Sequence, residues 1–301
     1  MAQSQQLISA KSRTRDAETM TTDARANRPF DDSREDSSTH GDLPGASGPA
    51  DAVPAISAPG TAREAAWLAR FDAAIPRNTV ADTWNWAWKD TVLRVLPFTV
   101  GAGLYARLNG HGLTDIGITR EQWWRETLIG IAVGIPLAGL AAVFRGWVAP
   151  GYRLPTNADQ LAQTFFYFVV NAPGEELFWR GSVQEAVVRG LARVPRMRRV
   201  AGLLGWLATT AAFGAYHRLG KWSWRSIAGV TFAGAIFGAL YQWPRGKRSI
   251  LAPTIAHGFA TAGFLSWADV YLYLRQRRGY LALLRARNED EQATSSHASG
   301  D

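Results

Sequence analysis

The sequence has no cysteine among its 301 residues. A disulfide framework, a zinc site built on thiolates and a cysteine nucleophile are therefore excluded. The N-terminal part of the chain also lacks the apolar stretch of a secretory signal peptide, so we expect no cleavage of that kind. Chemistry that depends on a thiol is thus absent from this chain.

The chain has a net charge of +8, and its positive charge is not spread evenly. The basic residues gather in short clusters between apolar runs, at residues 189–199, 218–225, 245–248 and 275–287. This distribution is typical of loops between membrane spans, where Lys and Arg set the orientation. A nucleic-acid partner is disfavoured, because water could not solvate the apolar segments between these clusters.

Apolar runs dominate the middle of the sequence. They cover residues 91–108, 127–144, 161–172, 200–216, 227–243 and 250–274. A spanning helix needs ~20 residues, so several runs require tilt or extension into their flanks. We predict an all-α fold, a polytopic membrane helix bundle with about six transmembrane helices. The pairs Gly130/Gly134 and Gly234/Gly238 are typical of helices that pack closely in membranes. We expect a multi-pass protein of a bacterial cell membrane, surrounded by lipid.

The composition divides the chain into four parts. Residues 1–65 are polar and poor in large apolar side chains, which predicts a disordered tail. Residues 66–90 form an interfacial segment with Trp84, Trp86 and Trp88 before the first apolar run. Residues 91–275 form the predicted membrane-embedded domain, and residues 276–301 a polar C-terminal tail.

Ionisable groups inside apolar spans are costly and are therefore functional candidates. Of five histidines, only His217 and His257 lie within or at the ends of apolar runs. The other ionisable residues that we place at membrane depth are Glu175, Glu176, Arg180 and Asp269. Each motif alone has a simpler explanation, such as a surface acid cluster or a histidine satisfied in a core. Together, two acids and two histidines on separate helices can activate a water molecule.

The two adjacent glutamates have different predicted surroundings. Glu176 and Arg180 are four residues apart, so they share a helix face and can form an ion pair. Glu175 points about 100° away from Glu176. We therefore expect one carboxylate to be held by the arginine and the other to face a cavity.

These residues form an ordered series of three short motifs. The motifs are Glu-Glu-x3-Arg at Glu175, Glu176 and Arg180, Phe-x3-His at Phe213 and His217, and His-x3-Thr at His257 and Thr261. The series resembles the CPBP family of CAAX proteases and bacteriocin-processing membrane proteins, also called the Abi family. The resemblance covers roughly residues 110–265. Thr261 stands where the family pattern usually has Asn.

The resemblance implies an activity and a role for each residue. The family contains type II CAAX prenyl endopeptidases, which remove the last three residues after a prenylated cysteine. It implies an intramembrane endopeptidase in which Glu175 is the general base and His217 positions the water. His257 and Thr261 would stabilise the oxyanion. The implied partner is a peptide or protein substrate, with prenylation left open.

Two alternatives stay open from the sequence. A catalytic zinc ion could be bound by Glu175, His217 and His257, because two histidines and one carboxylate form a known ligand set. The sequence lacks the His-Glu-x-x-His helix that would favour zinc. The chain could also be a non-catalytic membrane scaffold or a bacteriocin-immunity-type protein that retains the site, an alternative favoured by Thr261.

Overall fold

The computed structural model describes residues 62–242 and 248–298. The predicted N-terminal tail lies outside the described residues, except for residues 62–65, which belong to a helix. Within the described residues the fold is nearly all-α, which confirms the predicted class. Two short strands, β1 (Arg77–Asn78) and β2 (Leu154–Pro155), pair in parallel.

Eleven helices make up most of the described chain. They are α2 (Ala62–Ala74), α3 (Val80–Asp90), α4 (Leu96–Leu108), α5 (Trp123–Val148), α6 (Asn157–Phe165), α7 (Ala172–Phe178), α8 (Glu185–Ala192), α9 (Ala201–Tyr216), α10 (Trp224–Gln242), α11 (Leu251–Ala262) and α12 (Ala268–Ala298). Two 3₁₀ turns, Leu113–Ile116 and His217–Gly220, follow α4 and α9.

Segments of π-helix join several of these helices into longer continuous rods. They are Thr91–Val95, Phe166–Asn171, Trp179–Gln184 and Gly263–Trp267. Residues 157–192 thus form one rod, with Glu175 and Glu176 near its middle. Such π-helical turns occur frequently at functional sites.

Only one described helix, α5, is long and apolar enough to cross a membrane by length and composition. The predicted count of about six spans is therefore not confirmed by this criterion. One physical reason is that π-helical segments divide the rods that contain α4, α7 and α11, so that these α-helical pieces are shorter than a span. A helix that spans a membrane needs ~20 residues, and residues in π-helical turns can be part of that length.

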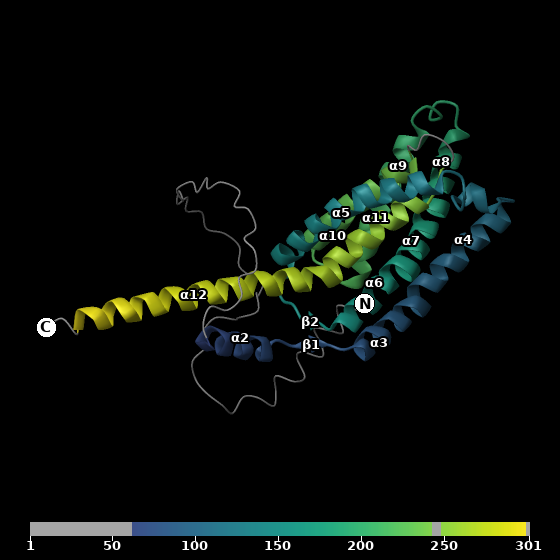
Figure 1. Ribbon diagram of the computed structural model, residues 1–301. Helices are drawn as coiled ribbons and strands as arrows, with labels where there is room; N and C mark the ends of the chain where they lie inside the picture. Colours follow the sequence, from purple (N-terminus) through teal and green to yellow (C-terminus); the bar gives the residue numbers. More distant parts are fainter. Residues whose placement is uncertain (1–61, 243–247, 299–301) are drawn as a thin grey trace.

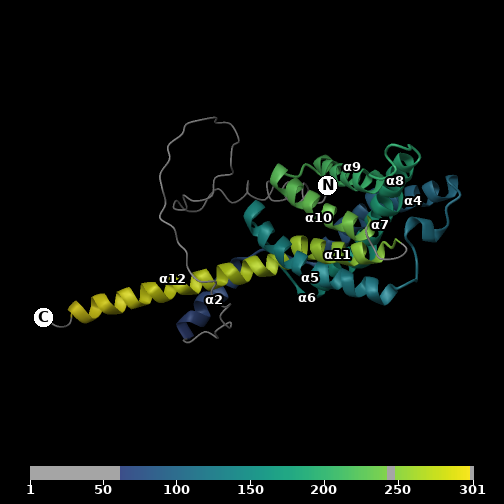
Figure 2. The same ribbon diagram turned by 90° about the horizontal axis from the view of Figure 1, so that it is seen from above.

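Helix α11 lies between α5 and α10 (Figure 2). Its approach to α5 is very close, because a Cβ atom added at Gly130 would lie 2.7 Å from Ile255 Cβ. One added at Gly134 would lie 2.5 Å from Phe259 Cδ2. The structure thus agrees with the predicted role of this glycine pair in close helix packing. On the other side of the bundle α7 contacts both α11 and α4, so α7 is surrounded by helices (Figure 1).

The C-terminal segment that we expected as a polar tail is helical as far as residue 298, and α12 projects beyond the bundle (Figure 1). Helix α2 packs against it. Phe71 stacks on Tyr280 with ring centroids 5.1 Å apart, and the Tyr273 hydroxyl donates to Asp72 at 2.9 Å. These contacts, together with good helix-forming residues, account for a helix in a polar segment.

Candidate functional site

Helix α7 carries the glutamate pair into the centre of the bundle. Both side chains are buried, with 2% and 0% exposure for Glu175 and Glu176. Glu176 Oε1 accepts a hydrogen bond from His257 Nδ1 of α11 at 2.7 Å. Its other oxygen, Oε2, lies 3.3 Å from Arg180 Nε. The structure therefore contains the ion pair expected from the spacing of Glu176 and Arg180.

Arg180 is fixed from several sides. Its Nη2 donates to the carbonyl oxygen of Gly234 in α10 at 3.0 Å. Its guanidinium carbon lies 4.8 Å from the ring centroid of Phe213 and 6.0 Å from that of Phe237. A charge buried this deeply is tolerated only when it is paired and hydrogen-bonded. Arg180 thus connects the glutamate pair to α9 and α10.

The two oxygens of Glu175 have unequal surroundings. Oε1 accepts a hydrogen bond from Asn171 Nδ2 at 3.1 Å and forms an ion pair with Arg94 Nη1. Oε2 has no hydrogen-bond partner within the described residues and lies 3.9 Å from His257 Nε2. One oxygen of this carboxylate is therefore fixed, and the other remains available to a ligand.

Arg94 was absent from the residues that we placed at membrane depth, and this part of the prediction was incomplete. It lies in the π-helical segment Thr91–Val95, where Asp90 accepts from its Nε at 2.8 Å and its Nη2 at 2.5 Å. Glu175 is consequently also paired with an arginine, although we expected only Glu176 to be. The available signal was a charged residue within the first apolar run.

The two histidines lie on either side of Phe213. The ring of His257 stacks on Phe237 at 4.6 Å and meets Phe213 edge-on at 6.1 Å. The ring of His217, which follows α9, lies 4.8 Å from Phe213. His217 is half-buried and within electrostatic range of Glu175. The second predicted motif therefore reaches the same region as the first and third.

Hydrogen bonds define which nitrogen of each histidine is free. His217 Nδ1 lies 2.8 Å from the carbonyl oxygen of Phe213. A carbonyl oxygen only accepts, so Nδ1 carries the hydrogen. In the neutral ring Nε2 then has a lone pair that can accept a hydrogen bond. In the same way the Glu176 carboxylate accepts from His257 Nδ1, which directs Nε2 towards Glu175.

Thr261 and Asp269 are less closely connected to this cluster. Thr261 is half-buried one turn after His257 on α11, and within the described chain its side chain has no hydrogen bond to the cluster. Asp269 is buried at the start of α12, within electrostatic range of Arg145. It is 12 residues from His257, about 18 Å along a helix. Asp269 therefore does not belong to the glutamate–histidine cluster.

The donor groups do not form a metal site as they stand. Among the described residues, no group of three or more His, Asp or Glu side chains is arranged to hold a metal ion. Zinc would require its ligands at ~2.0–2.2 Å, but one oxygen of Glu175 already faces Arg94 and both oxygens of Glu176 face cations or an imidazole. Two guanidinium groups beside the carboxylates would also repel the ion.

The comparison with protein families matches this region of the chain. A family model described as type II CAAX prenyl endopeptidase Rce1-like matches residues 157–263. Residues 157–263, about a third of the chain, are therefore similar to this Rce1-like family. The predicted resemblance to the CAAX protease family is thus confirmed. Comparisons with curated proteins and with solved structures gave no match.

The Rce1-like family is a family of membrane-embedded proteases that act on peptide or protein substrates. The matched Rce1-like region contains all three sequence motifs. Asp90 and Arg94 lie outside it, on the helical rod that begins at α3. The cluster is therefore completed by a segment that precedes the Rce1-like region.

Proposed function

We propose that this protein is an intramembrane endopeptidase in which Glu175 activates a water molecule. The observation that supports this proposal most directly is the arrangement of the Glu175 carboxylate. Arg94 and Asn171 fix Oε1, while the buried Oε2 is free of hydrogen bonds within the described residues and faces His257 Nε2. A general base needs a positioned oxygen with a free lone pair within hydrogen-bond reach of the water.

The reaction follows from this geometry. A water bound at Glu175 Oε2 gives a proton to the carboxylate while its oxygen attacks the scissile carbonyl carbon. The resulting tetrahedral intermediate carries the negative charge on the former carbonyl oxygen. Its carbon–nitrogen bond then breaks, and the proton passes from Glu175 to the leaving amine. The products are one peptide with a new carboxyl end and one with a new amino end.

The two histidines have different proposed roles. His217 Nε2 accepts a hydrogen bond from the attacking water, because its Nδ1 hydrogen is donated to Phe213. His257 in its charged form donates from Nε2 to the oxyanion, with Glu176 stabilising the ring charge through Nδ1. Thr261, one turn further along α11, supplies a second donor through its hydroxyl.

Arg94 is a proposed positioning residue, because it acts on the reaction through Glu175. Its side chain is 24% exposed and that of Asp90 is 19% exposed, whereas those of Glu175, Glu176, Arg180 and His257 are at most 7% exposed. Around the glutamate pair, the side chains of Asp90 and Arg94 are therefore more open than those of Arg180 and His257. We infer that the substrate peptide enters from this side.

The substrate class follows from the family. The family's activity favours a protein ending in a prenylated cysteine and three further residues, cleaved within a bundle of about six spans. The test compares a quenched fluorescent peptide that carries a farnesylated CAAX end with the same peptide lacking the prenyl group. The full chain is assayed in phosphatidylcholine vesicles.

Glu175→Gln is the decisive variant. It preserves size but removes the base, and general-base catalysis contributes about 10²- to 10⁴-fold. We expect at least about a 10²-fold loss of kcat, with Glu121→Gln, at an exposed position, as the matched control. Cleavage that is equal in Glu175→Gln and wild type would contradict the proposal. Stable wild-type protein that cleaves neither peptide would favour the non-catalytic scaffold or immunity-type alternative.

A further inference from the structure

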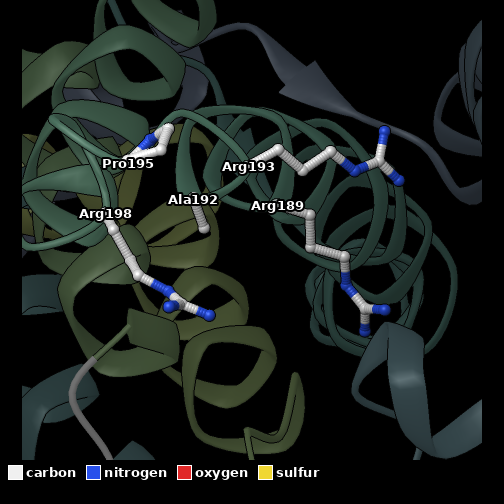
Figure 3. A pocket seen from close by; sticks show the side chains of 5 residues that line it. All are labelled: Arg189, Ala192, Arg193, Pro195 and Arg198. Atoms are coloured by element: carbon white, nitrogen blue, oxygen red, sulfur yellow. The ribbon is translucent and has the colours of Figure 1, made fainter.

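A second site candidate lies at the far end of the rod that carries the glutamates. A hollow of about 480 Å³ is lined by Arg189, Ala192, Arg193, Pro195 and Arg198 (Figure 3). Arg189 is 14 residues beyond Glu175, about 21 Å along the rod. The hollow is therefore separate from the proposed catalytic cluster, and its lining includes three guanidinium groups and no acidic side chain.

The three arginines differ in their acidic partners. Arg189 Nε lies 2.5 Å from Glu185 Oε1, and its Nη2 lies 3.5 Å from Asp115 Oδ1. The backbone N–H of Gly112 donates to Asp115 at 2.8 Å and lowers the pKa of that carboxyl below its usual value. Asp115 thus remains ionised at neutral pH and helps to hold Arg189 in place.

Arg193 and Arg198 have no acidic partner within the described part of the chain. Figure 3 shows them on either side of Ala192. The adjacent segment adds Arg196 and Arg199, which are also exposed. The hollow therefore carries positive charge that no side chain of the described residues neutralises.

Residues 193–200, which join α8 to α9, combine this charge with apolar exposure. Val194, Met197 and Val200 are 44%, 41% and 42% exposed, and four arginines lie in the same segment. A connection between two helices of a membrane-embedded domain lies near the membrane surface. There, apolar side chains enter the acyl region while guanidinium groups remain at the level of the lipid headgroups.

We propose that this arginine hollow binds the phosphate of an anionic phospholipid headgroup. The planar fork of a guanidinium group matches phosphate oxygens and forms paired hydrogen bonds with them. The uncompensated charge of Arg193 and Arg198 selects an anionic lipid over a zwitterionic one. This inference does not depend on the proposed proteolysis, since no catalytic residue lines the hollow.

The test measures lipid binding to the full chain in detergent micelles by native mass spectrometry. Phosphatidylglycerol, phosphatidylcholine and inorganic phosphate are titrated separately. The test variant is Arg193→Gln combined with Arg198→Gln. Each arginine near an anionic surface contributes about fivefold in affinity, so we expect about 30-fold weaker phosphatidylglycerol binding.

The matched control is Arg218→Gln combined with Arg225→Gln, which removes the same charge from the connection before α10 and the start of that helix. It should keep the affinity of wild type. Equal loss in both variants would refute a specific site, and so would equal binding of phosphatidylcholine. Displacement of phosphatidylglycerol by millimolar phosphate would show instead that the ligand is a soluble phosphate. Thermal unfolding without lipid confirms that both variants are folded.

Discussion

Arg180→Ala tests whether the buried arginine holds the glutamate pair or takes part in the chemistry. Arg180 is 1% exposed and its partner Glu176 is 0% exposed. Removing one partner of such a pair leaves a buried charge without compensation, at a cost of ~3–5 kcal/mol. The hydrogen bond to Gly234 and the contact with Phe213 are lost as well.

The expected loss of stability is large enough to measure directly. For a domain of this size, 1 kcal/mol shifts Tm by about 2–4 °C, so we expect a decrease of about 6–20 °C. Thermal unfolding in one detergent, followed by tryptophan fluorescence, measures this decrease. Arg120→Ala is the matched control, because Arg120 is exposed and its loss should shift Tm by less than about 2 °C.

A double variant separates the contributions. Adding Glu176→Gln to Arg180→Ala removes the buried negative charge, so it should recover part of the lost stability. Activity should remain low, because His257 Nδ1 would lose its carboxylate partner. Arg180→Ala protein with an unchanged Tm but no activity would refute this reasoning, and would assign Arg180 to substrate binding or catalysis.

Four further outcomes follow from the same geometry. Arg94→Gln should lower kcat about 10²-fold with little change in KM, and Arg94→Lys should recover part of the loss, as steady-state kinetics will show. Gly234→Ala should lower stability by ~1–3 kcal/mol in thermal unfolding, because the added Cβ would lie 2.5 Å from Phe213 Cδ1. Thr261→Asn should raise kcat if residue 261 donates to the oxyanion, and an unchanged kcat would contradict that role. Peptide cleavage should persist after treatment with a metal chelator, and its loss would refute the glutamate-only mechanism.

Much of the site could be predicted because charged groups in apolar runs are conspicuous. The Glu176–Arg180 pair followed from helix spacing alone, since residues four apart share a face. Arg94 could not be assigned to Glu175 in this way. The two are 81 positions apart, so their contact depends on how the rod from α3 to α4 packs against α7. Arg94 also lies near the start of its apolar run. An arginine there has a simpler explanation, in which its charged group lies in the polar region at the membrane surface.

The helices were predictable to a similar degree. The run at residues 200–216 agrees closely with α9 (Ala201–Tyr216), whereas the run at 227–243 begins three residues inside α10. The π-helical segments were not foreseen, because an extra residue is visible only as a shift of an apolar stripe, and helices that are apolar on most faces show no clear stripe. The helical C-terminal segment was missed for another reason. Its contacts with α2 are tertiary, and a polar composition by itself does not indicate them.

Charge balance explains how so polar a cluster can be buried and still leave one reactive atom. The carboxylates of Asp90, Glu175 and Glu176 are matched by the guanidinium groups of Arg94 and Arg180 and by the charged form of His257 that we propose. Glu175 and Glu176 have four carboxylate oxygens between them. Three of these lie at hydrogen-bond or ion-pair distance from a guanidinium, an amide or an imidazole N–H. The fourth, Glu175 Oε2, faces only His257 Nε2 at 3.9 Å. An unpaired buried oxygen costs ~1–3 kcal/mol, and a bound water removes that cost. Glu176 Oε2 also has no hydrogen bond among the described residues, but it lies 3.3 Å from Arg180 Nε, whereas Glu175 Oε2 has no guanidinium partner. Glu175 Oε2 is therefore the carboxylate oxygen best placed to hold the water of the proposed reaction.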